Sequence, residues 1–430
     1  MRKKAPPQEL LFEGRMIQWT FIFFLGSVIR RKELQDVHWR NSMGTLPSKA
    51  EVVIIGGGIV GASIAYYLSK KGVDDVLLLE RRLLGAGTTA KCVGGIRTQF
   101  STRINIEFSV LSRKIFDRFE EEFGVDPEFH PIGYLFLAVR GTQWEILKAN
   151  ARLMRTFGLK ASLLDPGEIQ QRWPWLRVND LLGGSYTEKD GYAGPYEVLR
   201  GFAARAKQLG ADIREGVEVI GIHAKNRKIQ AVETSTGERI LTPMVVNAAG
   251  PYAARIADMV GLALPVRPLR RQLFFTDPIE SLPMQLPMVI DLEYGWYMRR
   301  EGRGLLLAGP QDSESSFNEG VDFEGQEWTA ERSLHRIPLL EHASIARGWA
   351  GLYEISPDHH AIIGAFPELE GFICANGFSG HGFQHSPAAG ILVAELIVDG
   401  AAESLDIYPL RPQRFQEGDL LPEPLTAFRD

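Results

Sequence analysis

The feature that most constrains this chain is a glycine-rich turn between an apolar run and a helical pattern, near residue 56. Residues 51–55 are mostly β-branched and apolar, which is typical of a buried parallel strand. Gly56, Gly58 and Gly61 follow with G-x-G-x-x-G spacing, and the periodicity of residues 62–71 predicts a helix. A glycine turn placed between a strand and a helix predicts a dinucleotide-binding βαβ unit.

Each part of this fingerprint has a physical task. Gly56 permits the tight turn, Gly58 lets the backbone approach a pyrophosphate, and Gly61 lets the helix pack closely on the strand. The helix N-terminus then presents N–H groups and its positive dipole end to the phosphates. A second strand, residues 76–79, ends in Glu80, which can accept hydrogen bonds from ribose hydroxyls and would repel a 2′-phosphate.

Three further segments favour FAD over NAD. Residues 84–89 form a second small, hydroxyl-rich loop, and residues 245–250 predict a strand that ends in small residues. Residues 377–383 precede a predicted helix over 387–398, whose N-terminus could stabilise negative charge on a reduced flavin. An NAD-dependent dehydrogenase is the alternative, but it leaves the 377–383 loop without a task. The residues expected to contact the cofactor are Gly56, Gly58, Ile59, Val60, Gly61, Glu80, Arg81, Thr88, Thr89, Ala249, Gly250, Gly380, His381, Gly382 and Phe383.

Taken together, these segments resemble the D-amino-acid-oxidase-like (DAO) flavoprotein superfamily. Within it, the chain is most similar to the branch of sarcosine oxidase β subunits and dye-linked L-proline dehydrogenase β subunits. The resemblance covers residues 51–418 and is strongest at residues 85–100, 132–137, 349–353, 356–358, 362–364 and 377–383. The same stretches also resemble mitochondrial FAD-dependent oxidoreductases that assist the assembly of respiratory complex I.

The resemblance implies an α/β fold (α+β overall) with a Rossmann-like FAD-binding domain. A mixed or antiparallel β-sheet that binds the substrate is inserted into that domain. We expect the FAD-binding domain to comprise residues 49–130, 195–262 and 346–430, and the substrate domain to comprise residues 131–194 and 263–345. Residues 1–48 do not share this resemblance, and we expect them to be an N-terminal extension that is disordered, a membrane anchor, or the product of a mis-assigned start ahead of Met43. The resemblance also places Val219 where relatives contact adenine through the backbone.

For chemistry, the resemblance implies oxidation of a small carboxylated amine by hydride transfer to flavin N5. Arg97 matches an arginine on the substrate side of the flavin, and a guanidinium pairs bidentately with a carboxylate; a structural ion pair is the alternative. Tyr353 matches a pocket tyrosine, although core packing would also explain it. Gln384 stands where relatives often carry a lysine, and His381 lies in the flavin loop, where it could equally be a satisfied loop histidine.

Three departures from the family pattern carry predictions. The cysteine that tethers FAD in monomeric sarcosine oxidases is replaced by Gly351, and the histidine that tethers it in dimethylglycine dehydrogenases by Lys91. We therefore expect noncovalent FAD, and we do not interpret Cys92 as a tether. By our alignment Leu307 replaces the oxygen-activating lysine of the oxidases, which favours a dehydrogenase.

The composition limits the partners. With 48 basic and 53 acidic residues, the net charge of -5 gives no electrostatic case for nucleic-acid binding. With only two cysteines, the chain has neither a disulfide framework nor a cysteine-rich metal site, and this count fits a cytoplasmic location. His359 and His360 are adjacent, so in a strand they would face opposite sides, and we expect no metal site there. Membrane contact is expected only through the apolar residues 16–29. An α-type subunit or another electron acceptor is the expected partner; the alternative function is an FAD-stabilised assembly protein.

Overall fold

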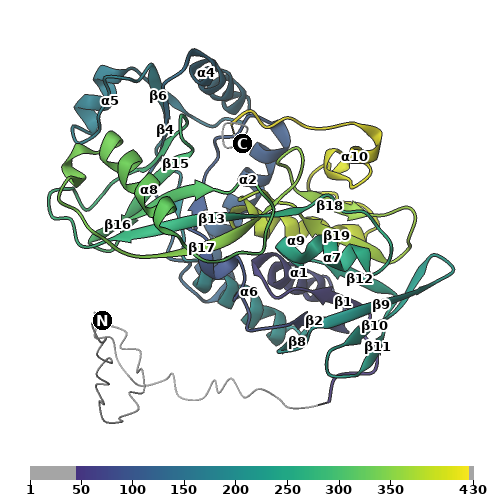
Figure 1. Ribbon diagram of the computed structural model, residues 1–430. Coiled ribbons are helices and arrows are strands. Elements are labelled where there is room, and N and C mark those ends of the chain that lie inside the picture. The colour runs from purple at the N-terminus through teal and green to yellow at the C-terminus, as the bar shows by residue number, and fades with distance from the viewer. Residues whose placement is uncertain (1–44, 426–430) are drawn as a thin grey trace, which may run out of the picture. The chain divides into compact units, whose positions relative to one another are not determined.

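The fingerprint strand lies in a six-stranded sheet with the order β18-β19-β12-β1-β2-β8. The computed structural model of the protein describes residues 45–425. Neighbouring strands in this sheet are parallel, except that β18 runs antiparallel to β19. The strands are β1 (Val52–Ile55), β2 (Val76–Glu80), β8 (Asp212–Glu215), β12 (Met244–Asn247), β18 (Ile362–Ala365) and β19 (Phe372–Asn376) (Figure 1).

Both faces of this sheet are buried, which is why its strands are nearly continuous apolar runs. Val52 and Ile54 of β1 belong to one cluster of buried apolar side chains. Val53 and Ile55 point the other way and belong to a second cluster. The first cluster is built with helices α1 (Ile59–Lys70), α2 (Arg103–Phe116), α6 (Pro195–Gln208) and α9 (Gly382–Val398).

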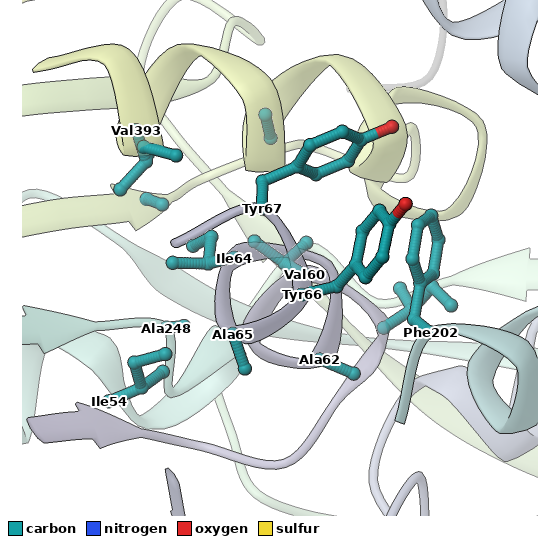
Figure 2. Close-up of a cluster of buried hydrophobic side chains, with 14 of the residues drawn as sticks. Ile54, Val60, Ala62, Ile64, Ala65, Tyr66, Tyr67, Phe202, Ala248 and Val393 are labelled. Atoms are coloured by element: carbon teal, nitrogen blue, oxygen red, sulfur yellow. The ribbon is translucent and has the colours of Figure 1, made fainter. Parts of the chain in front are cut away.

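Helix α1 packs against both α6 and α9, so its residues from Ile59 to Ser69 are all buried. Figure 2 shows its side chains directed toward Ile54 of the sheet, Phe202 of α6 and Val393 of α9. A β-carbon on Gly390 of α9 would lie 2.2 Å from Ser63 Oγ, so a glycine is required for the two helices to approach this closely. The first turn of α1 is thereby fixed beneath the glycine-rich turn.

The second large sheet has eight strands in the order β17-β13-β16-β15-β14-β4-β6-β5. Only the β14–β4 pair is parallel among its pairings. Side chains alternate across it, so one face carries a cluster with Tyr134, Phe136 and Tyr297, and the other a cluster with Leu135, Leu137 and Met298. The strands are β4 (Tyr134–Ala138), β5 (Ser162–Leu164), β6 (Gly183–Thr187), β13 (Arg267–Thr276), β14 (Met288–Asp291), β15 (Trp296–Glu301), β16 (Gly304–Gln311) and β17 (Ile345–Ile355).

The remaining elements connect or flank these sheets. They are β3 (Gly95–Ile96) with β7 (Gly191–Tyr192), the three-stranded sheet β9 (Val219–Lys225), β10 (Lys228–Thr234) and β11 (Arg239–Leu241), and helices α3 (Phe119–Phe123), α4 (Gly141–Thr156), α5 (Pro166–Arg172), α7 (Ala253–Asp258), α8 (Phe323–Arg336) and α10 (Arg414–Glu417). No helix within residues 45–425 is long and apolar enough to cross a bilayer.

The predicted fold class is confirmed: a mainly parallel, doubly covered sheet is combined with a mixed sheet of eight strands. The division into two domains with the stated boundaries stays a prediction. Strand β17 pairs with β13 in the eight-stranded sheet, although its residues fall in the segment predicted for the FAD domain. The apolar segment 16–29 and all of the predicted extension except residues 45–48 lie outside the described residues.

Candidate active site

Three adjoining hollows lead from the carboxyl ends of β1, β2 and β12 to the inner face of the eight-stranded sheet. We number the hollows in this order, from the strand ends to the eight-stranded sheet. Gly58 and Gly250 line both the first and the second hollow. Gly351 and Tyr353 line both the second and the third. The hollows therefore form one continuous groove, and its first part lies at the strand ends where open α/β sheets bind nucleotides.

The first hollow contains most of the residues predicted to bind the adenosine half of the cofactor. Glu80 closes β2, and its two carboxylate oxygens accept hydrogen bonds from the backbone N–H groups of Gly57 (2.7 Å) and Arg82 (2.8 Å). The carboxylate is thereby held at the turn. The predicted residues that line this hollow are Gly56, Gly58, Glu80, Arg81, Thr88, Val219, Ala249 and Gly250.

The sequence did not indicate Tyr252, whose ring lies 3.7 Å from the guanidinium carbon of Arg81 in the same hollow. Phe317, from the loop before α8, stacks on Tyr252 with ring centroids 4.6 Å apart. No motif marks either aromatic, because the contact depends on a loop that returns from the other sheet.

The glycines of the turn show whether this groove fits a dinucleotide. A β-carbon on Gly56, where φ is +113°, would lie 2.4 Å from Ala248 O, and one on Gly61 would lie 2.0 Å from Gly56 O. Both glycines are thus required by the protein itself. A β-carbon on Gly58 would meet nothing closer than Thr89 Oγ1 at 3.5 Å, so the space beside Gly58 is left open on the groove side. That combination is what a pyrophosphate at the helix N-terminus requires.

The second hollow joins the N-terminal ends of α1 and α9. Its lining includes the predicted residues Ile59, Val60, Thr88, Thr89, Gly250, Gly380, Gly382 and Phe383. Thr89 Oγ1 accepts a hydrogen bond from Ile59 N at 3.0 Å, so the hydroxyl-rich loop is fastened to the first turn of α1. Gly61 lies beneath this turn, where it packs on the strand.

Lys91 and Gly351, the two positions at which relatives tether FAD, face each other in this hollow. Lys91 Nζ forms an ion pair with Glu319 at 3.0 Å. Burial raises the pKa of the Cys92 thiol to about 11, so Cys92 is a neutral thiol at physiological pH. A neutral thiol is a poor nucleophile; that Cys92 is not a tether stays a prediction.

The third hollow brings together Arg97, Tyr353, His381 and Gln384, the four residues predicted to act on the substrate. The Arg97 guanidinium donates to Gln99 O and lies 3.0 Å from His381 Nε2. Its carbon lies 3.8 Å from the Phe100 ring centroid. The arginine is therefore held in a single orientation at the edge of the hollow, although it is only 6% exposed.

Gln384 supports Arg97 from the first turn of α9. Its Oε1 accepts a hydrogen bond from Arg97 N at 2.8 Å. Its buried Nε2 has no hydrogen-bond partner within the described part of the chain, and the residue lines the hollow. At the next residue of α9, burial and the charge of Arg97 lower the pKa of His385 to about 3, so this imidazole is neutral.

The eight-stranded sheet contributes a residue that sequence reasoning missed. Arg271 of β13 lines the third hollow, is 3% exposed and donates to Gly295 O. It lies beside Tyr297, whose hydroxyl is 3.4 Å from that of Tyr353. The alternation of β13 was the available signal, since Arg271 shares a face with Leu269 and Leu273 and this face packs inward.

The prediction for Leu307 is wrong. Leu307 pairs with Phe274 and Met298 and belongs to the cluster on the far side of the sheet. Its neighbour Leu306 carries its side chain on the groove side, in the cluster that contains Tyr297. A slip of one residue in the alignment moves a side chain to the opposite face. The groove-facing residue at this point of β16 is still an uncharged leucine.

His359 and His360 lie in the turn after β17 and not in a strand. His360 is buried, with Nε2 2.9 Å from Thr102 Oγ1 and Nδ1 2.8 Å from Asp358 O. Between residues 45 and 425, no three His, Cys, Asp or Glu side chains are grouped so that they could hold a metal ion.

The structure combines a Rossmann-type sheet, a groove that fits a dinucleotide, and a second sheet over the far end of that groove. This is the architecture of flavoproteins that bind FAD on a Rossmann-type domain and the substrate at a separate β-sheet. The chain matches the model of the DAO family, FAD dependent oxidoreductase, over residues 51–396. The protein belongs to this family; it is an FAD-dependent oxidoreductase with FAD as its cofactor.

Individual relatives agree with this family assignment. The chain is 31% identical to FAD-dependent oxidoreductase domain-containing protein 1 of Xenopus laevis, over 86% of this chain and 83% of that protein. It is 31% identical to mitochondrial sarcosine dehydrogenase of Mus musculus, over 86% of this chain but only 42% of that protein. Among solved structures, L-proline dehydrogenase from P. horikoshii matches with a TM-score of 0.82 and 35% identity, over 87% of this chain and 100% of that chain.

Proposed function

We propose that the protein oxidises the carbon–nitrogen bond of a small amino acid, imino acid or N-methyl amino acid, such as proline or sarcosine. The observation that carries the proposal is the charge of the third hollow. Its lining contains Lys91, Arg97 and Arg271, and no Asp or Glu among the described residues. An anionic group on the substrate is the natural complement of such a site.

In this proposal Arg97 binds the substrate carboxylate. Its contacts with Gln99 O and His381 fix the guanidinium before the substrate arrives, so little order is lost on binding. Gln384 contributes the Nε2 donor beside it, in place of the lysine of relatives. Bound FAD supplies the two-electron acceptor for the reaction.

The sheet residues of the hollow would hold the amine end of the substrate and exclude water. Tyr297 and Tyr353 lie hydroxyl to hydroxyl at 3.4 Å, while Phe136, Leu273 and Ile290 make the rest of this wall apolar. An apolar wall with a few polar groups orients a small ligand by its charged end.

The names of the relatives support this substrate class. Sarcosine and L-proline, named for two of them, are both small, carboxylated secondary amines. Glycine oxidase of Geobacillus kaustophilus, 25% identical with a TM-score of 0.76, is named for another small amino acid. Since this chain spans less than half of the sarcosine dehydrogenase, the whole activity of that enzyme is carried over only as part of the proposal.

We propose a dehydrogenase, because Leu306 leaves no cation from β16 on the groove side of the sheet. The electrons would pass to an α-type subunit or another acceptor, in the cytoplasm. The test is to add L-proline, sarcosine, glycine and other N-alkyl amino acids anaerobically to the purified holoenzyme and to record flavin absorbance. Bleaching by at least one supports the proposal, whereas an inert flavin across the panel overturns it and favours the alternative, an FAD-stabilised assembly protein.

A further inference from the structure

Glu354, near the end of β17, is a carboxyl group that the proposed chemistry does not use. Its side chain lines the second hollow, between the Ala248–Gly250 turn and the first turn of α9. The β-carbons that Gly250 and Gly382 lack would lie 3.8 Å from Glu354 Oε2 and 3.6 Å from Glu354 Oε1 respectively. The carboxyl group therefore lies between the two walls of the cofactor groove.

Glu354 also holds the loop that leads into α9. Its Oε2 accepts a hydrogen bond from Gly377 N at 3.1 Å, and its backbone carbonyl accepts one from Ser379 N at 3.0 Å. Ser379 has a φ of +51°, which is uncommon for a residue with a side chain and persists only when neighbours enforce it. Glu354 thus fixes the backbone of the loop 377–383, once through its side chain and once through its backbone carbonyl.

Little positive charge among the described neighbours of Glu354 stabilises its ionised form. Among the described residues that line the second hollow, Lys91 is the one cation, and it is paired with Glu319. Tyr353 lines the same hollow, His381 at the start of α9 is turned to Arg97, and Arg267 at the start of β13 is exposed.

Burial raises the pKa of Glu354 to about 7, against the opposing effect of hydrogen bonds from the backbone of Gly377 and Phe378. The group is therefore poised between its two forms near neutral pH. FAD brings a negatively charged diphosphate into the same groove, and this charge disfavours the ionised form of a carboxyl group further.

We propose that Glu354 is a positioning residue that is neutral when FAD is bound, so that FAD binding takes up a proton and weakens as Glu354 ionises. The inference rests on the cofactor alone and holds for any substrate. The sign follows from linkage: if the complex binds more protons than the free protein, affinity falls as the pH rises. At pH values above the pKa of Glu354 in the free protein, each pH unit raises the Kd of FAD by up to about tenfold.

The test is the Kd of FAD between about pH 6 and about pH 8.5, for the wild type and Glu354→Gln. We expect the wild-type Kd to rise about tenfold or more over this range. We expect Glu354→Gln to vary by less than about threefold and to match the wild type at low pH, since the amide keeps the acceptor oxygen. A flat wild-type profile, or an unchanged slope in Glu354→Gln, would overturn the proposal.

Glu395→Gln is the matched control. Glu395 is buried and, like Glu354, accepts hydrogen bonds from backbone N–H groups, here those of Glu403 and Ser404, but it lies on α9 away from the groove lining. This variant is expected to keep the wild-type slope. Should Glu354→Gln not fold, calorimetry of FAD binding to the wild type in buffers of different ionisation enthalpy decides. Net proton uptake at about pH 7.5 supports the proposal, and none contradicts it.

Discussion

The β-carbon that Gly351 lacks would lie 3.1 Å from Cβ of Lys91, so the two positions used for tethers in different relatives meet at one point of the groove. Gly351 lies in the middle of β17, opposite Arg271 of β13, and Lys91 ends the short turn Thr89–Lys91. Two segments far apart in the sequence thus converge where a covalent link to the flavin would form, and neither position is a cysteine or histidine.

From this relationship we predict that the FAD is noncovalent. Precipitation of the holoenzyme with acid should release the yellow cofactor into the supernatant, and the protein band on a denaturing gel should show no flavin fluorescence. Flavin that stays with the precipitated chain would contradict the prediction and would point to another attachment residue.

Substitutions at two glycines of the turn should affect stability and FAD affinity differently. Gly61→Ala places a β-carbon 2.0 Å from Gly56 O, and we expect it to lower the free energy of unfolding by about 3 kcal/mol. Gly58→Ala meets no protein atom closer than 3.5 Å, so its stability should stay within about 1 kcal/mol of the wild type. Its FAD affinity should nevertheless fall at least about tenfold, because the methyl group enters the groove.

Urea unfolding of the apoproteins and FAD titration check these two variants. Gly141→Ala, where a β-carbon meets nothing within 4 Å, should leave both quantities unchanged. If Gly58→Ala binds FAD like the wild type, the pyrophosphate does not lie where the fingerprint indicates.

Arg97→Lys should reduce kcat/KM about 100-fold, mainly through KM, because lysine loses the bidentate geometry. That loss corresponds to about 2.7 kcal/mol of binding. Arg118→Lys, a change at a side chain that is 68% exposed, is the control and should leave the kinetics unchanged. Steady-state assays with an artificial dye as acceptor give both constants. Unchanged kinetics in Arg97→Lys would leave Arg97 with a structural role alone.

The ion pair of Arg414 and Asp358 should dominate the stability of the C-terminal region. Arg414 Nε and Nη2 donate to the two carboxylate oxygens at 2.8 and 2.9 Å, and both side chains are fully buried. Removing one partner strands a buried charge, so Arg414→Met should cost about 3–5 kcal/mol. Arg411→Met, which breaks half-exposed pairs, should cost at most about 1 kcal/mol. Urea unfolding near pH 7 compares the two, and equal losses would contradict the account.

The same pair predicts a pH dependence. Burial acts to raise the pKa of Asp358, but the hydrogen bonds and charge of Arg414 outweigh it and hold the pKa below its ordinary value. A lowered carboxyl pKa stabilises the fold above the unfolded pKa, and this stabilisation is lost as the pH falls through the folded value. Arg414→Met should therefore flatten the acid limb of the stability profile.

The sequence allowed the fingerprint, the cofactor and the fold class to be predicted, because each rests on local patterns. Local patterns did not predict where α9 begins. A helix from Pro387 was expected, yet α9 begins at Gly382 and contains the proline. Ser386 Oγ donates to Phe383 O at 2.9 Å, and this bond replaces the N–H that Pro387 lacks. A proline inside a helix is tolerated where a neighbour satisfies the stranded carbonyl.

Strand register was the other limit. Arg271 was missed and Leu307 was assigned to the groove, although Leu306 is the residue that faces it. Both errors have one cause: which face a residue occupies depends on pairing across β13, β15 and β16, and a single sequence does not fix that pairing.

The central claim, that a positively charged hollow selects carboxylated amines for oxidation, is tested most directly by single-turnover reduction of the bound flavin. Stopped-flow absorbance would compare L-proline with pyrrolidine, and sarcosine with dimethylamine, under anaerobic conditions. We predict that at least one of the two acids bleaches the flavin at least about 100-fold faster than the amine without a carboxylate. Equal rates within every pair that reduces the flavin, or no reduction by any of the four, would contradict the account.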